Sequence, residues 1–273
     1  MRPERDNIAA PDLPEGLTWV GEEPRSMPLL TAAGPVLVHF FDFAQLNSVR
    51  TLPYLVEWDR RYRDAGLTTL GVQAPRSPFG ADSEAVAAGL EGLGVEFPVA
   101  IDARHELWQA YGCEGWPSLF LWTTGGALSW FHFGEGEYLN TELTIQEELR
   151  ELDALRSLPD PMEALRPSDT PSARVMPPTP EVFPGGSWDQ PWIASADEAE
   201  LEIDYAAAVA AATVEGSGEL GVAIDGGEPR PIQITRPGLQ ILAEHERHEA
   251  HRLTLTTDGG LRIWSVSFAA GLP

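Results

Sequence analysis

The single thiol bounds the redox chemistry that this sequence can support. Cys113 is the only cysteine among 273 residues, so an intrachain disulfide is excluded. A lone thiol can still act in redox chemistry, by forming a sulfenic acid or a mixed disulfide with glutathione. The alternative is a small loop residue that packs, because free cysteines are commonly buried and inert.

Three histidines recur at a spacing of three near the C-terminus, His245, His248 and His251, with glutamates between them. On a helix they would share a face and could hold a zinc ion. The spacing differs from the His-Glu-x-x-His pattern of zinc proteases, and the run precedes a predicted strand. We therefore interpret it as a solvated, charged hairpin, and we expect no metal and no cofactor.

Tryptophans in the same part of the chain suggest a sugar-stacking site. Trp264 alternates with Val266 and Phe268, a pattern that predicts a core position instead. Trp188 and Trp192 stand in a segment rich in proline and glycine, where they either are exposed or cover the core.

The element around which the chain is organised lies between Gly34 and Leu55. Val36–Phe41 is an unbroken apolar run, which predicts a fully buried strand. Ser48 is the predicted N-cap of a helix over Val49–Asp64. Pro53 lies inside that helix and should kink it, because its ring clashes with a carbonyl one turn back.

This strand, turn and kinked helix resemble the active-site unit of thioredoxin-like proteins (redoxins), most closely those of the TlpA and DipZ type. The run Arg50–Leu55 is close to what DipZ-type sequences carry. In that family a Cys-x-x-Cys motif opens the helix, and the kinking proline stands five residues after the second cysteine. The four motif positions, counted back from Pro53, are Gln45, Leu46, Asn47 and Ser48. Both cysteines are therefore missing.

The missing cysteines argue against dithiol exchange at this site. Dithiol exchange needs a thiolate nucleophile and a second thiol that resolves the mixed disulfide. Neither a glutamine amide nor a serine hydroxyl without a general base can play those parts. The resemblance also implies a buried acid in the strand, at the position of His39. We expect a degenerate active site in which no residue is catalytic.

The resemblance covers roughly residues 12–155 and implies a thioredoxin-like α/β fold, a central mixed sheet flanked by helices. Strands are predicted at Leu17–Val20, Leu67–Gln73, Phe97–Ile101 and Ala127–Phe133, and helices at Ser83–Leu93, Ala103–Tyr111 and from Thr141 to about Leu155. Such alternation of strands and helices indicates crossover connections and a largely parallel sheet. The resemblance also implies a cis-proline at Trp116–Pro117, and the run His132–Tyr138 again looks like DipZ-type sequences.

The degenerate motif and the Trp116–Pro117 loop could together form a polar pocket for an extended peptide, since thioredoxin-like folds clasp substrates along that loop. The binding candidates are Phe43, Gln45, Asn47 and Trp116. The alternative is that the polar residues only cap the helix, because Ser and Asn are favoured there for structural reasons.

The composition changes after the predicted closing helix. Residues 156–186 are rich in proline and predict a semi-extended linker between a domain of residues 1–155 and one of residues 187–273. Beyond it, apolar residues alternate with polar or small ones, as at Leu201, Ile203 and Tyr205. Short alternating strands separated by glycine-rich turns predict an all-β antiparallel sandwich. It looks like a reduced version of the jelly-roll-like domain that ends DipZ-type proteins.

Charge and hydropathy exclude several partners. The chain has 42 acidic and 18 basic residues and a formal net charge of -24, which repels phosphate backbones and anionic lipids. We expect neither a nucleic-acid nor a membrane partner. The first residues lack the apolar core of a secretory signal, and no apolar run is long enough to span a bilayer, so the expected location is cytoplasmic.

Two functional classes remain open. The preferred one is a redox-degenerate thioredoxin-family protein that binds a protein, a peptide or a small ligand without catalysis. The alternative is a thiol-disulfide oxidoreductase or a peroxiredoxin-like antioxidant enzyme that acts through Cys113. A peroxidase would need its cysteine at the start of the first helix, where the chain has Gln45.

Overall fold

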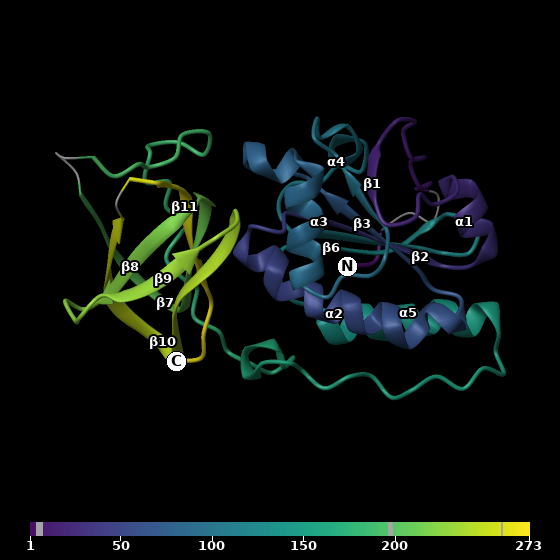
Figure 1. The fold of residues 1–273 in the computed structure, drawn as a ribbon. Coiled ribbons are helices and arrows are strands. Elements are labelled where there is room, and N and C mark those ends of the chain that lie inside the picture. Colours follow the sequence, from purple (N-terminus) through teal and green to yellow (C-terminus); the bar gives the residue numbers. More distant parts are fainter. Residues whose placement is uncertain (4–7, 196–198, 258) are drawn as a thin grey trace. The chain divides into compact units, whose positions relative to one another are not determined.

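The computed structural model describes residues 1–3, 8–195, 199–257 and 259–273 (Figure 1). These residues form two compact units. The first comprises Met1–Phe43 and Asn47–Leu165, and the second comprises Ala44–Leu46 and Arg166–Pro273. Within the described part of the chain, no helix is long and apolar enough to cross a membrane.

A six-stranded mixed sheet forms the centre of the first unit. Its strands, in the order β1-β4-β3-β2-β5-β6, are β1 Thr18–Val20, β4 Val99–Ile101, β3 Thr68–Gln73, β2 Val36–Phe41, β5 Ser118–Trp122 and β6 Leu128–Phe133. Strand β2 pairs in parallel with β3 and antiparallel with β5. All six residues of β2 are buried, which confirms the predicted buried strand. The predicted mixed sheet is confirmed too, but the expectation of a largely parallel sheet is wrong, because three of its five strand pairings are antiparallel.

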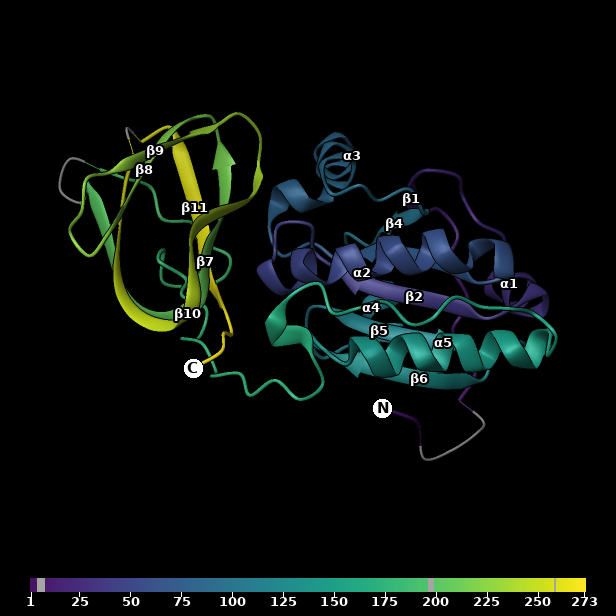
Figure 2. The ribbon, with the colours of Figure 1, turned by 90° about the horizontal axis from the view of Figure 1, so that it is seen from below.

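Helices cover both faces of this sheet. They are α1 Met27–Ala33, α2 Leu46–Tyr62, α3 Ser83–Gly92, α4 Glu106–Ala110 and α5 Tyr138–Leu152, with 3-10 turns η1 Arg63–Ala65 and η2 Pro78–Ala81. A third 3-10 turn, η3 Pro167–Asp169, belongs to the second unit. Figures 1 and 2 show α2 and α5 side by side across one face. On the opposite face, Val38 and Phe40 of β2 pack in one apolar cluster with Met27 of α1 and Leu107 of α4.

Buried polar contacts fix α2 against α5. Glu142 of α5 accepts a hydrogen bond from the Tyr62 hydroxyl at 2.6 Å and pairs with Arg61 at 2.8 Å. The rings of Tyr54 and Tyr138 stack with their centroids 3.7 Å apart. These contacts hold the helix that carries the degenerate motif at a defined place on the sheet.

Two local predictions for this unit need correction or addition. Ser48 is not the N-cap of its helix, because α2 begins two residues earlier, at Leu46, and Ser48 lies in its first turn. Helix α1 was not predicted at all. Asp82 is the N-cap of α3, since its carboxylate accepts a hydrogen bond from the main-chain N–H of Ala85 at 2.8 Å.

The second unit is an all-antiparallel sheet, as predicted. Its five strands, in the order β11-β7-β10-β8-β9, are β11 Leu261–Ala269, β7 Glu200–Gly216, β10 Gly238–Thr257, β8 Gly218–Ile224 and β9 Arg230–Ile234. Strands β7 and β10 are far longer than their alternating patterns indicated, and β10 curves strongly (Figure 2). The alternation breaks down in the alanine-rich run 206–212, which continues β7 regardless.

The core of this unit depends on a change of register in β11. Its pairing with β7 shifts between Ile263 and Ser265. Because of that shift, Ile263 joins Val266 and Phe268 in the main apolar cluster, where the sequence pattern placed Trp264. Trp264 is nevertheless buried, and its indole N–H donates to Glu215 at 3.0 Å.

The segment predicted as a linker divides between the two units. The main-chain N–H of Leu165 donates to the Tyr54 hydroxyl, and that of Met162 donates to Glu142, both in the first unit. Further on, Val182 exchanges main-chain hydrogen bonds with Val266 of β11. Residues 156–186 therefore hydrogen-bond to folded structure near both of their ends.

Candidate functional site

The turn between β2 and α2 is held by a buried polar network. Asp42 accepts hydrogen bonds from the Arg76 main-chain N–H at 2.8 Å and from the Gln73 side-chain amide at 3.3 Å. The Gln73 amide oxygen in turn accepts from the main-chain N–H of Phe43 at 2.9 Å. Asp42 and Gln73 are buried, so their polar atoms replace the water that these main-chain groups would otherwise need.

Ser48 belongs to the same network. It is fully buried, and its hydroxyl accepts a hydrogen bond from the main-chain N–H of Asp42 at 3.2 Å. At the position of the second family cysteine, this side chain therefore stabilises the preceding turn. The first two motif positions, Gln45 and Leu46, are grouped with the second unit, whereas Asn47 and Ser48 lie in the first.

His39 occupies the position of the family's buried acid and is fully buried. Neither of its ring nitrogens has a hydrogen-bond partner among the described residues. Burial lowers the pKa of His39 to about 3, so the ring is neutral at physiological pH. With a pKa this low, the neutral ring is only a weak base at physiological pH.

Aromatic side chains surround the cis-proline loop. The Trp116–Pro117 peptide bond is cis. The half-buried Trp116 ring stacks on Trp108 at a centroid distance of 5.2 Å, and its indole N–H donates to the Ala74 carbonyl at 2.8 Å. His105 lies against both indole rings at 5.9 Å, and the Arg76 guanidinium lies 5.6 Å from the Trp116 ring.

The sequence did not predict this aromatic cluster of Trp108, Trp116 and His105. Trp108 lies in the helix predicted at Ala103–Tyr111, and no pattern in the sequence marks His105. His105 has a positive φ of 56° just before α4, a backbone conformation that no side-chain pattern announces. The one available signal was the Trp-Pro dipeptide, which marked the loop but not its neighbours.

Cys113 packs in the core of the first unit. It is 5% exposed and belongs to the apolar cluster of β2, α1 and α4, on the face opposite α2. Burial raises the pKa of its thiol to about 12, because the charged thiolate would lose its hydration. The thiol therefore stays protonated at neutral pH, in a setting unlike that of reactive cysteines.

Phe43, a predicted binding candidate, is also buried. Its ring meets Phe79 edge to face at 5.9 Å. It also lies so close to Gly89 that a Cβ there would come within 2.5 Å of the ring. Phe43 thus packs inside its unit, whereas the aromatic candidate Trp116 is only half-buried.

The residues singled out near the C-terminus lie in different environments. The predicted charged hairpin is wrong, because residues 245–251 belong to the single strand β10, which bulges there. Trp188 is 61% exposed, whereas Trp192 is buried and pairs with Ile263 of β11. The two tryptophans therefore do not form one stacking surface.

Comparison with known proteins finds relatives that match nearly the whole chain. No protein-family model matches the chain. The chain is 28% identical to protein DipZ of Mycobacterium bovis over 302 aligned positions, which cover 95% of this chain and 42% of DipZ. DipZ of Mycobacterium tuberculosis matches equally well. The chain thus spans less than half the length of these relatives.

More distant similarities cover a smaller share of the chain. Human NHL repeat-containing protein 2 is 25% identical over 185 residues, 66% of this chain and 24% of that protein. Among solved structures, a thiol-disulfide isomerase from Corynebacterium glutamicum is 23% identical with a TM-score of 0.46, covering 53% of this chain and 98% of the isomerase chain.

The strand order, the buried β2–α2 unit and the closing helix α5 define a thioredoxin-like protein that lacks the two motif cysteines. An all-β unit follows the thioredoxin-like unit in the chain. The sequence similarity to DipZ extends along nearly the whole chain and so includes both units.

Proposed function

We propose that this chain is a redox-inactive thioredoxin-fold protein that binds an extended polypeptide segment along the cis-proline loop. One observation carries the proposal. The positions that would need thiols hold Gln45 and Ser48, and the only cysteine, Cys113, is buried with its pKa raised to about 12. The groups required for thiol-disulfide exchange are therefore absent from the place where the fold would use them.

The loop offers what an extended peptide needs. Within residues 1–3, 8–195, 199–257 and 259–273, the main-chain N–H and C=O of Trp116 take part in no hydrogen bond. Such unpaired groups can pair with the main chain of a bound strand. The adjoining aromatic cluster supplies apolar area beside them, and Arg76 adds a positive charge.

The electrostatics of Cys113 disfavour the competing thiol enzyme. A nucleophilic cysteine is usually exposed in part and has a lowered pKa, whereas both properties are reversed here. The thiol lies among apolar neighbours such as Phe40 and Phe120, which leave a disulfide substrate no approach.

Selection from a library of random linear peptides, followed by calorimetric titration of the best binders, tests the proposal. We expect Trp116→Ala to weaken binding by roughly tenfold or more, as expected for loss of an aromatic anchor. The matched control is Trp188→Ala, which removes an exposed tryptophan from the other unit.

Main-chain pairing is tested by methylating the peptide amides one at a time. If one or two methylations abolish binding while side-chain changes are tolerated, strand-like pairing is supported. Peptides that bind Trp116→Ala as well as they bind the wild type would contradict the proposed site.

A further inference from the structure

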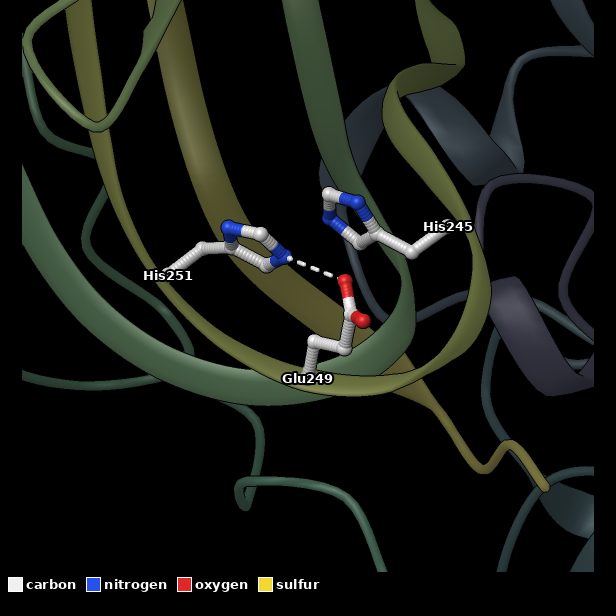
Figure 3. Close-up of side chains that lie close together, drawn as sticks. All are labelled: His245, Glu249 and His251. Atoms are coloured by element: carbon white, nitrogen blue, oxygen red, sulfur yellow. Dashed lines mark ion pairs between the residues drawn. The ribbon is translucent and has the colours of Figure 1, made fainter. Parts of the chain in front are cut away.

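Three side chains of β10 converge in the second unit. Single ligand atoms of His245, Glu249 and His251 all lie within 4.8 Å of one another (Figure 3). The two imidazole rings stack with their centroids 3.9 Å apart and their planes inclined by 16°. Two nitrogen donors and one oxygen donor thus lie close enough together to hold a single ion.

A bulge in β10 creates this convergence. The pairing of β10 with β7 shifts once between Ile241 and Ala243, then places Glu244 opposite Val209 and resumes only at Glu249 opposite Ala207. Five steps along β10 therefore match two along β7, so three extra residues are looped out. In a regular strand, residues six apart such as His245 and His251 would stand about 20 Å from each other. The backbone irregularity is what brings the rings together, and bulges commonly re-aim side chains at functional places.

Neighbouring groups hold both rings in place. The carboxylate of Asp225 lies 2.7 Å from Nδ1 of His251, and the Tyr205 hydroxyl lies 2.8 Å from Nε2 of His245. Asp225 is itself fixed, because it also accepts a hydrogen bond from the Arg252 main-chain N–H at 2.8 Å. A carboxylate behind an imidazole is the usual support for a metal-binding histidine, since it sets the tautomer and the ring orientation.

The arrangement leaves an unpaired acceptor aimed at a carboxylate. With Nδ1 of His251 donating to Asp225, Nε2 carries the lone pair of the neutral ring. This atom is buried, has no hydrogen-bond partner among the described residues, and lies 3.6 Å from Oε2 of Glu249. That separation is too long for a hydrogen bond. It is close to the separation of about 3.4 Å expected for two tetrahedral ligands with bonds of about 2.0–2.2 Å to one ion.

We propose that His245, Glu249 and His251 bind a divalent transition-metal ion of the zinc type, with Asp225 orienting His251. Two imidazoles and one carboxylate form a donor set that suits zinc and leaves a coordination position for water or a ligand. His251 and Asp225 also line an open cavity of about 430 Å³, together with Tyr205. The acidic surface of the chain favours the approach of a cation.

Titration of the full chain, purified without a histidine tag, with Co²⁺ and then with competing Zn²⁺ tests the site. We expect visible absorption bands that saturate at one ion per chain and disappear on addition of Zn²⁺. His245→Ala and His251→Ala should each abolish the bands, and Asp225→Asn should weaken binding by about 10- to 100-fold.

The matched control is His248→Ala, which removes the third histidine of the same strand. Its main-chain N–H pairs with Leu272, so the change spares the backbone contact. Circular dichroism and melting curves without metal check that each variant folds. Three results would overturn the proposal: no saturable binding, equal loss in His248→Ala, or binding that persists in the double variant His245→Ala with His251→Ala.

Discussion

Two clusters of polar side chains, one at the start of α2 and one in the bulge of β10, differ in what their polar atoms face. Asp42 and Ser48 face N–H donors of their own unit, and each accepts a hydrogen bond. In the bulge, two acceptors, Nε2 of His251 and a carboxylate oxygen of Glu249, face each other. In the first cluster these acceptors already have hydrogen-bond donors, whereas in the second a cation would bind between the two facing acceptors. Buried or half-buried polar residues thus indicate a ligand only where their own neighbours do not satisfy them.

The largest expected effect comes from restoring the missing chemistry at α2. The double variant Gln45→Cys with Ser48→Cys should reduce disulfides at a rate roughly tenfold or more above the wild type, because a helix N-terminus lowers thiol pKa values and raises the thiolate fraction. The measurement is reduction of insulin disulfides by dithiothreitol. Ser48→Cys alone serves as the control, since one thiol cannot resolve the mixed disulfide. A folded double variant without activity would show that more than the thiols has been lost.

A stability comparison sharpens the contrast between the two clusters. Asp42→Ala should lower the free energy of unfolding by about 2–4 kcal/mol, because two buried donors lose their acceptor. Glu249→Gln, measured without metal, should change it by no more than about 0.5 kcal/mol, since the side chain is largely exposed. Urea unfolding of both variants gives these values. Equal losses would contradict the distinction.

At pH 8, the smallest expected effect concerns His39, which has no partner for either nitrogen among the described residues. His39→Leu should raise the free energy of unfolding by about 1–3 kcal/mol at pH 8. The leucine side chain has a similar volume but carries no polar atom that burial leaves without a hydrogen bond. The pKa of His39 is lowered to about 3 in the folded chain from an ordinary value of 6.5. Between pH 3 and pH 6.5, His39 is protonated in the unfolded chain but not in the folded chain. The wild type therefore loses stability as the pH falls through this range.

The difference between variant and wild type should therefore grow from pH 6.5 towards pH 3, by up to about 1.4 kcal/mol per pH unit. Unfolding measured at several pH values checks this slope. Leu37→Met is the matched control, since it changes a buried residue two positions away on the same strand. A stability difference for His39→Leu that does not vary with pH would show that His39 is not buried in its neutral form.

Much of the first unit was predictable, because its elements follow from local sequence patterns and from the resemblance of its strand, turn and kinked helix to thioredoxin-like proteins. The apolar run Val36–Phe41 coincides with β2, and Asp82 caps α3 as its position before the helix indicated. The role of Ser48 was not predictable in detail. Its spacing fits an N-cap, but the helix starts earlier, and the hydroxyl instead accepts from Asp42.

The second unit shows where sequence patterns fail. Its antiparallel strands were foreseen from alternation, but the bulge in β10 was not, since no residue type announces the three extra residues. A spacing of three places His245, His248 and His251 on one face only if they lie on a helix. Because the run precedes a predicted strand, we interpreted it as a solvated hairpin. The cluster in the structure contains Glu249 and not His248. The bulge in the backbone, which the sequence does not reveal, determines which side chains come together.

The most direct test of the central claim is reduction of insulin disulfides by dithiothreitol in the presence of the purified wild-type chain and of Cys113→Ala. The account predicts that both proteins leave the rate at that of dithiothreitol alone, because Cys113 is buried and protonated and the motif positions hold no thiol. A clear acceleration by the wild type that Cys113→Ala abolishes would identify Cys113 as a nucleophile and contradict the account.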